Sequence, residues 1–526
     1  MTIAQITGEA LIGGVAQRGA GGSFKAWNPT TREHIEPAFH MVDKDQIDQA
    51  CRLAGAAFDI FRNTTDEERA AFLDTVAEQI MALGDALVER AMLETGLPRA
   101  RIEGERGRTC NQLKLFGSLL REGSWQDPRI DPALPQRTPP RPDLRSRLIG
   151  VGPVAVFAAS NFPLAFSVAG GDTASAFAAG CPVVLKAHSA HPGTSELVAR
   201  AVVKAVELCG LPAGTFTLLT GTGNGIGQAL VGHPAIQAVG FTGSRSGGTA
   251  LMAVAAARPQ PIPVYAEMSS INPVFLLPQA LEQHAERIGR DFATSLTMGV
   301  GQFCTNPGLV LAIDGPGLST FCASATAALN DTKPATMLSA GIASSFRRGV
   351  EALGSNDAVT TLLRLEHEDN QGHAALFRVE GAEFLARKEL HEEVFGPASL
   401  LVACESVEQM RDIVEHLEGQ LTAAIHLEEG DIEAAKVLMP SLERKVGRIL
   451  ANGFGTGVEV AHAMVHGGPF PATADGRSTS VGTGAIFRFL RPVAYQNLPQ
   501  ALLPAVLRDE NPRGIWRRRD GALGKE

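Results

Sequence analysis

The sequence lacks the features that mark membrane, secreted and zinc-binding proteins. No run of about 18 apolar residues occurs, so no segment is expected to cross a bilayer. No basic stretch precedes the first apolar residues, which argues against a secretory signal. Neither a CxxC pair nor an HExxH motif is present, and the seven cysteines are widely spaced and odd in number. We therefore expect free thiols in a reducing cytoplasm, and no metal site.

Basic residues are also fewer than acidic residues. The chain has 47 basic and 56 acidic residues, and its formal net charge is −9. Such a chain is poorly suited to binding a phosphate backbone, so nucleic acid is not an expected partner. Hydrophobic residues make up 44 % of the 526 residues, which is enough for folded cores in two to four domains of roughly 100–200 residues each.

Short apolar runs alternate with helical patterns from residue 151 onward. Strands are predicted at 151–160, 181–187, 215–221, 235–243 and 261–268, with helices at 192–210, at 225–232 and from 244. Repeated strand–helix units predict an α/β fold with a parallel, twisted sheet, and such sheets bind nucleotides where their strands end.

Other segments flank this pattern. Two helices are predicted before it, at 45–62 and 66–95, and a second α/β region is predicted to begin at 273. The proline-rich stretch 126–149 excludes a helix or a central strand and predicts an excursion from the core. The polar, basic residues 506–526 are predicted to form an exposed tail.

Several side chains lie at predicted strand ends, where parallel sheets usually carry their catalytic and binding groups. Cys304 lies in the glycine-rich loop TMGVGQFCTNPG, Glu267 ends a predicted strand, and Asn161 and Lys186 follow two others. Taken singly, each has a structural alternative: a buried thiol, an exposed carboxylate, a turn or cap, a surface amine. The stretch FTGSRSGG follows a strand and opens a helix, so Gly243 could let a pyrophosphate approach the helix N-terminus.

Six short motifs, taken together, are far more specific. In chain order they are SNFP (160–163), VVLKAHS (183–189), FTGS (241–244), AEMSS (266–270), GQFCTNPG (301–308) and EEVFGP (392–397). In this order and spacing they resemble the aldehyde dehydrogenase superfamily along nearly the whole chain. Two longer stretches, at 160–186 and 466–499, look most like the superfamily's 2-oxoglutarate semialdehyde (2,5-dioxovalerate) dehydrogenases. The fatty aldehyde dehydrogenase of luminous bacteria is the next most similar.

The resemblance implies an NAD(P)-dependent oxidation of an aldehyde to a carboxylate through a cysteine thioester. Cys304 would be the nucleophile, Glu267 the general base, and Asn161 would hold the oxyanion with the Cys304 backbone N–H. The residues implied to bind the cofactor are Lys186, Ser189, Gly243, Ser244, Gly248, Glu393 and Phe395. An enzyme that passes its thioester to coenzyme A and a non-catalytic paralogue are the rival interpretations, and Glu267 argues against the first.

The resemblance also implies a domain organisation. A Rossmann-like cofactor domain would take residues 1–126 and 150–275, and an α/β catalytic domain residues 276–482. A small β element for oligomerisation would combine 127–149 with 483–505. A homodimer or homotetramer is expected, since a strand pair standing alone leaves an edge to be paired.

The predictions of cofactor preference and of substrate each depend mainly on one residue. Ser189 stands where NAD-preferring relatives often carry a glutamate that repels a 2′-phosphate, so we predict that NADP is used and preferred. Arg477, in the segment expected to wall the aldehyde tunnel, could bind a distant carboxylate; the alternative is that it ties down its own loop. The predicted substrate is a short ω-oxo acid, whereas Phe162 and Phe166 could instead line a channel for fatty aldehydes.

Overall fold

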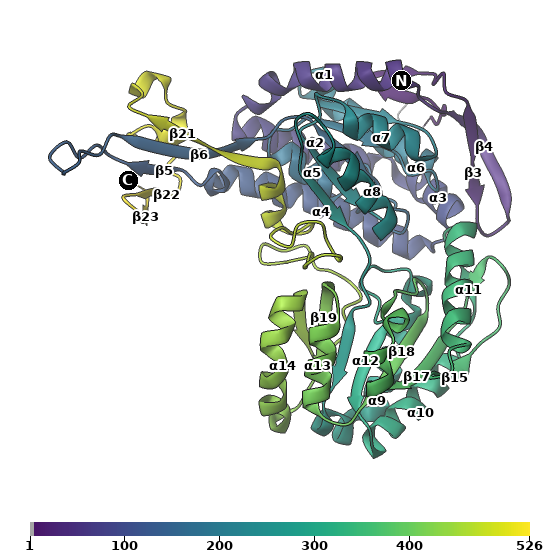
Figure 1. Cartoon of the computed structure of the whole chain (residues 1–526). Coiled ribbons are helices and arrows are strands. Elements are labelled where there is room, and N and C mark those ends of the chain that lie inside the picture. The colour runs from purple at the N-terminus through teal and green to yellow at the C-terminus, as the bar shows by residue number, and fades with distance from the viewer. Residues whose placement is uncertain (1–4, 526) are drawn as a thin grey trace.

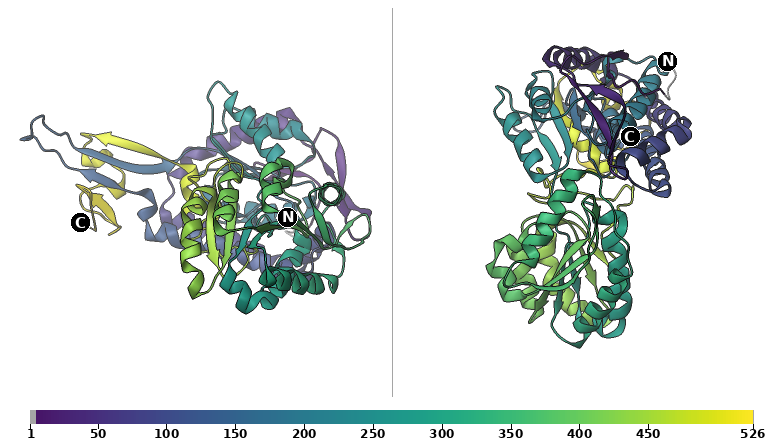
Figure 2. Two further views of the ribbon diagram at one scale, coloured as in Figure 1. Left: turned by 60° about the horizontal axis from the view of Figure 1, so that its bottom comes forward. Right: turned by 90° about the vertical axis from the view of Figure 1, so that its right-hand side faces the viewer.

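Two lobes, each built on a seven-stranded sheet, and a projecting arm make up the computed structural model (Figure 1). The structure describes residues 5–525. The left view of Figure 2 shows the arm leaving the first lobe and extending away from the body. Within the described residues, no helix is long and apolar enough to cross a membrane.

The first lobe contains the predicted parallel sheet. Its strand order is β11-β10-β7-β8-β9-β1-β2; the pairs β9–β1 and β1–β2 at one edge are antiparallel, and the other pairs are parallel. The strands are β1 (Ala10–Ile12), β2 (Val15–Gln17), β7 (Val154–Phe157), β8 (Val183–Lys186), β9 (Phe216–Leu219), β10 (Ala238–Thr242) and β11 (Val264–Glu267). Strands β7 and β9 are buried along their whole length, which explains why they read as continuous apolar runs.

The helices of this lobe cover the sheet or pack on one another. They are α1 (Lys44–Arg62), α2 (Asp66–Ala82), α3 (Gly84–Thr95), α4 (Arg99–Glu122), α5 (Gly171–Ala178), α6 (Pro192–Leu208), α7 (Asn224–Gly232) and α8 (Arg245–Ala256). The helix predicted at 66–95 is two helices, because the chain breaks at Gly84, whose φ of 53° is left-handed. A hairpin of β3 (Ser23–Asn28) and β4 (Glu33–His40) lies beside this lobe (Figure 1).

The second lobe has a sheet of order β15-β17-β18-β13-β12-β19-β20, parallel except for β15. Its strands are β12 (Pro273–Leu276), β13 (Leu309–Ile313), β15 (Thr360–Arg364), β17 (Ala375–Glu380), β18 (Ala398–Cys404), β19 (Gln420–His426) and β20 (Val446–Ala451). Its helices are α9 (Pro278–Thr297), α10 (Pro316–Asn330), α11 (Ala340–Gly354), α12 (Gly381–Ala386), α13 (Val407–His416) and α14 (Ile432–Lys445).

The arm is a five-stranded sheet of order β21-β6-β5-β22-β23. Its strands are β5 (Arg129–Asp131), β6 (Leu144–Gly150), β21 (Leu490–Gln496), β22 (Arg517–Arg519) and β23 (Ala522–Gly524). The prediction of an exposed tail at 506–526 is therefore wrong. Strand β22 pairs in parallel with β5, and Arg517 is buried because its guanidinium donates to backbone carbonyls of Arg508 and Asp509.

One segment returns from the second lobe to the first and forms backbone hydrogen bonds with the first lobe's sheet. Residues 453–482 follow β20 and run along the end of β11, where Met268 N donates to Ala472 O and Ala474 N donates to Ala266 O, each at 2.8 Å. This pairing extends the first sheet by one short stretch. It fixes residues 466–482 against the carboxyl end of β11.

Candidate active site

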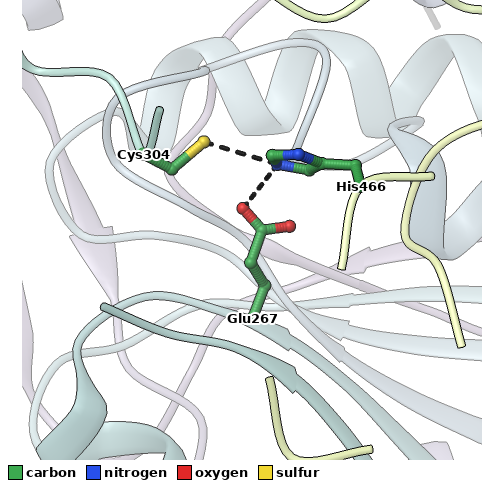
Figure 3. A group of neighbouring side chains, drawn as sticks. All are labelled: Glu267, Cys304 and His466. Carbon is green, nitrogen blue, oxygen red and sulfur yellow. Dashed lines mark hydrogen bonds and ion pairs between the residues drawn. The ribbon is translucent and has the colours of Figure 1, made fainter. Parts of the chain in front are cut away.

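Three side chains from three distant segments meet between the lobes (Figure 3). Cys304 comes from the loop after the 3-10 turn η3 (Met298–Gly301), Glu267 ends β11, and His466 lies in the returning segment. His466 Nε2 lies 2.8 Å from Glu267 Oε1 and 3.4 Å from Cys304 Sγ. The structure thus brings the predicted nucleophile and base together, with a histidine between them.

Glu267 is held as a carboxylate. Burial raises its pKa, but His466 and Ser480 outweigh burial and the net direction is down. Ser480 Oγ donates to Glu267 Oε2 at 2.8 Å, so each carboxylate oxygen accepts a hydrogen bond. An ionised, oriented carboxylate is what a general base requires.

Cys304 is held as a thiol. Burial and the negative charge of Glu267 raise its pKa well above the usual range. Because His466 presents the same nitrogen, Nε2, to both partners, its single N–H is taken by the ionised carboxylate. This arrangement favours Glu267 as the acceptor of the thiol proton, with His466 as the hydrogen-bond partner of that carboxylate.

The predicted oxyanion donor lies next to the nucleophile's loop. Asn161 Nδ2 donates to Gln302 O at 3.0 Å, two residues before Cys304. Within residues 5–525 the Cys304 backbone N–H donates to no protein acceptor. The Asn161 amide, which contacts this loop, and the free N–H of Cys304 on the loop are suited to stabilising an oxygen that gains negative charge.

The loop that presents Cys304 has an unusual backbone. Gly299, Val300 and Gly301 all have positive φ, and a valine in this region is strained. A Cβ on Gly301 would come 2.3 Å from the carbonyl carbon of Gly396, so this position accepts only glycine. Behind the loop, Asn272 Nδ2 donates to Cys304 O at 2.9 Å and fixes the backbone of the nucleophile.

A cavity of about 440 Å³ opens at the carboxyl ends of β8 and β10. Lys186, Gly243 and Ser244 line it, together with the N-terminal turns of α7 and α8. A Cβ on Gly243 would come 2.8 Å from the Phe241 ring, so glycine keeps this approach open. Helix N-termini and a lysine fit the phosphates of a dinucleotide.

The other four predicted cofactor residues lie outside that lining, and two of them are in the first lobe. Ser189 occupies the turn between β8 and α6, half-buried. Gly248 packs inside α8, where a Cβ would come 2.6 Å from Met268 Sδ. Gly248 thus serves the packing of α8 against β11.

Glu393 and Phe395 line a second hollow, beside Ser270 and Phe303. Burial raises the pKa of Glu393 to about 8, although the backbone N–H of Ser270 favours the carboxylate. This hollow adjoins Cys304 through Phe303, the preceding residue, which agrees with the nicotinamide-side role implied by the sequence.

The predicted substrate-binding residues lie in two different places: two are near His466, and one is at the surface. The Phe162 and Phe166 rings pack together, with centroids 5.2 Å apart, and the Phe166 ring centroid lies 6.0 Å from that of His466. Arg477, in contrast, is at the surface. Its side chain is 91 % exposed and binds Asp475, two residues away, so it holds its own loop and does not approach Cys304.

His466 is the site residue that sequence reasoning missed. The sequence carried one signal for it: His462 and His466 stand four residues apart in AHAMVHGG. The ligand atoms of Glu267, Cys304 and His466 all lie within 4.8 Å of one another, close enough to share a metal ion. The absence of a metal site therefore stays a prediction.

Comparison with known proteins identifies the family. The model of the aldehyde dehydrogenase family matches residues 16–353. The chain is 55 % identical to alpha-ketoglutaric semialdehyde dehydrogenase 2 of Azospirillum brasilense, over 98 % of this chain and 99 % of that protein. The chain belongs to the aldehyde dehydrogenase family.

Further relatives agree with this assignment. An alpha-ketoglutaric semialdehyde dehydrogenase of Acinetobacter baylyi is 48 % identical over 98 % of both chains. Among solved structures, betaine aldehyde dehydrogenase of Staphylococcus aureus in complex with NAD⁺ has a TM-score of 0.80 at 20 % identity, over 94 % of this chain and 97 % of that one. The predicted family, α/β fold class and NAD(P)-dependent aldehyde dehydrogenase activity are confirmed.

Proposed function

We propose that this aldehyde dehydrogenase oxidises a short ω-oxo acid, 2-oxoglutarate semialdehyde first, to the dicarboxylate. The observation that carries the proposal is the 55 % identity, along essentially the whole chain, to a relative named for that substrate. The site agrees with it, because the residues that would perform the oxidation stand together around Cys304.

The site's own groups account for both halves of the reaction. Cys304 Sγ attacks the aldehyde carbon as its proton passes to Glu267, and the Asn161 amide and the Cys304 N–H hold the new oxyanion. Bound nicotinamide supplies the hydride acceptor. Glu267, once free of the first proton, takes a second from the water that attacks the thioester, and the acid is released.

We further propose that NADP is preferred over NAD. Among residues 5–525, no carboxylate lines the cavity beside Lys186, so no acidic side chain in this lining repels a 2′-phosphate, and His188 joins Lys186 there. The test is to measure kcat/KM for both cofactors in the wild type and in Ser189→Glu. The variant should shift preference toward NAD, and a wild type without NADP activity would contradict the proposal.

We also propose a cytoplasmic homodimer or homotetramer. The arm presents two sheet edges and several exposed apolar side chains, which favours pairing with another subunit. All seven cysteines are free, as expected in a reducing compartment.

A panel of aldehydes tests the substrate. We expect the highest kcat/KM for 2-oxoglutarate semialdehyde, a lower value for 5-oxopentanoate, and much lower values for pentanal and decanal. Preference for decanal would replace the proposal with a fatty aldehyde dehydrogenase, for which the Phe162–Phe166 pair is the favourable observation. Formation of an acyl-CoA on adding coenzyme A would point to the acylating alternative.

A further inference from the structure

Two arginines of α4 approach the aromatic rings that surround the nucleophile. Arg101 and Arg108 are seven residues apart, so they share one face of the helix. The Arg101 guanidinium carbon lies 4.5 Å from the Phe162 ring centroid and 5.1 Å from that of Phe303. The Arg108 guanidinium carbon lies 5.2 Å from the Phe166 ring centroid.

These rings connect the arginines to the reacting groups. Phe303 directly precedes Cys304, and its ring centroid is 5.3 Å from that of Phe162. Phe166 packs near His466, with ring centroids 6.0 Å apart. Both cations thus contact aromatic side chains that lie beside the reacting groups, near the loop that carries Asn161.

The two arginines differ in how their donors are used. Arg101 Nη1 pairs with Glu105 Oε2 at 2.5 Å, and Glu105 Oε1 accepts the backbone N–H groups of Leu164 and Ala165 at 2.9 Å each. Arg101 is therefore tied, through Glu105, to the loop that follows Asn161. It has a structural partner, which makes it a positioning residue.

Arg108 has no such partner. Its one hydrogen bond within residues 5–525 is a long contact of 3.4 Å from Nε to Val458 O, and its buried Nη1 has no acceptor. A buried charged donor without an acceptor is costly, because water no longer solvates it and no protein group replaces water. Such a group in a binding site is usually completed by the ligand.

The electrostatic surroundings agree with this. Burial lowers the pKa of Arg108, whereas Glu105, Cys304 and Glu267 act in the opposite direction. The guanidinium remains a cation at any physiological pH. Cys304 and Glu267 are thus near enough to act on Arg108, although neither makes a contact with it.

We propose that Arg108 binds the carboxylate at the far end of the aldehyde substrate, an inference that rests on the proposed function. The substrate's aldehyde would lie at Cys304 and its carboxylate at the free edge of the guanidinium. The planar fork can donate to a carboxylate through two N–H groups, and the Phe166 ring holds its plane. Arg108 thus takes the specificity role that the sequence suggested for Arg477.

The experiment compares an ω-oxo acid with a neutral aldehyde of the same length. Wild type, Arg108→Met and Arg108→Lys are assayed with 5-oxopentanoate and with pentanal. Arg99→Met, on the same helix but with an exposed side chain, is the control. Binding of glutarate, which mimics the carboxylate end, is measured separately as a competitive inhibition constant, so that the result does not depend on turnover.

Arg108→Met should raise KM for 5-oxopentanoate and the glutarate inhibition constant about 10- to 100-fold, as expected for one charge-assisted contact. Its KM for pentanal should change less than about twofold. Arg108→Lys should fall between, because it keeps the charge and loses the fork. Arg99→Met should match the wild type. Arg108→Lys also keeps the test informative if Arg108→Met does not fold.

The outcomes separate the two proposals. If the wild type favours the oxo acid and Arg108→Met keeps that preference, Arg108 is not the anchor and the proposed function stands. Equal losses on both substrates would make Arg108 structural. If the wild type itself does not favour the oxo acid over pentanal, the proposed substrate is wrong.

Discussion

At the residue scale, the proposed reaction assigns both proton transfers to one carboxylate. Glu267 is buried, yet it remains ionised because His466 and Ser480 donate to its two oxygens. Two hydrogen bonds to the charged form thus offset the desolvation of a carboxylate. The carboxylate is therefore ionised, and it lies beside the thiol from which a proton must be removed.

Replacing His466 should shift the pH profile. Burial raises the pKa of Glu267, and the contact with His466 lowers it. The variant His466→Gln weakens that contact, so the pKa of Glu267 should rise. Glu267 is active when deprotonated, so the acid limb of kcat should move to higher pH, and kcat at neutral pH should fall about tenfold or more. The measurement is kcat from about pH 4 to 9, because the wild-type limb is expected below the usual pKa of a glutamate.

His462→Gln is the matched control, because His462 is exposed and lies four residues away. It should keep the wild-type limb. A lower kcat in His466→Gln with an unmoved limb would make His466 a packing residue without influence on the base. Glu267→Gln should lose the limb altogether.

Lys186 should make cofactor binding depend on pH. Burial lowers its pKa to about 8, so the free enzyme loses this cation as pH rises through 8. The phosphates favour the charged form, so the Kd of NADP⁺ should be steady below pH 8 and rise above it, by up to about tenfold per pH unit. Fluorescence titration between pH 7 and 9.5 measures this.

The comparison needs two variants. Lys186→Met should bind more weakly and with a Kd that no longer changes over this range. Lys204→Met removes an exposed lysine of α6 that pairs with Glu207, and it should behave as the wild type. A flat wild-type profile would show that Lys186 stays charged or does not touch the cofactor.

At the scale of elements, the turn before Cys304 depends on glycine. Gly301 has a φ of 64°, and an added Cβ would meet the backbone of Gly396. Gly301→Ala should therefore destabilise the protein by more than about 1 kcal/mol and lower kcat strongly. In contrast, Gly104 lies in α4 with open space around it, and Gly104→Ala should stabilise the protein by about 0.5–1 kcal/mol.

Thermal unfolding and steady-state kinetics on both variants measure these effects. Gly104→Ala should raise Tm and leave kcat unchanged. If Gly301→Ala kept the wild-type Tm and kcat, the turn would be able to relax, and the tight approach to Gly396 would have no part in placing Cys304.

Local patterns predicted elements well where burial is continuous along the chain. The run 215–221, predicted as a strand, contains β9, and all four residues of β9 are buried, as expected for a strand covered on both faces. The break at Gly84 was missed, since the helical pattern continues on either side of it. The 24-residue helix α4 was also missed, and it carries both arginines of the further inference.

Contacts between residues far apart in the sequence limited how much of the site could be predicted. Cys304, Glu267 and Asn161 were found because each stands in a motif of the family. His466 approaches Glu267 across 199 residues, by way of a segment whose course depends on pairing with β11, and no local pattern encodes that. Arg477 was chosen for its chemistry, but its position is set by its own loop.

At the scale of the whole molecule, the arm is the part that a single chain does not explain. It projects from the first lobe (Figure 1). Its C-terminal strands β22 and β23 extend its sheet on one side, so β23 is the edge strand there. Strand β21, at one edge, carries Pro492, which weakens backbone pairing there. Exposed apolar side chains on the arm, rather than a bare strand edge, are therefore the better candidates for an interface.

These side chains are the basis of the last prediction. Leu502 and Leu523 are 68 % and 58 % exposed, and an apolar side chain at an interface is buried by association. In the double variant Leu502→Glu/Leu523→Glu, association would have to bury two charges, so the oligomer should dissociate into smaller species in light scattering and sedimentation. Val15→Glu, a change at an equally exposed position on β2 of the first lobe, should leave the mass unchanged. A monomeric wild type would exclude the oligomer, and an unchanged mass in the double variant would place the interface elsewhere on the molecule.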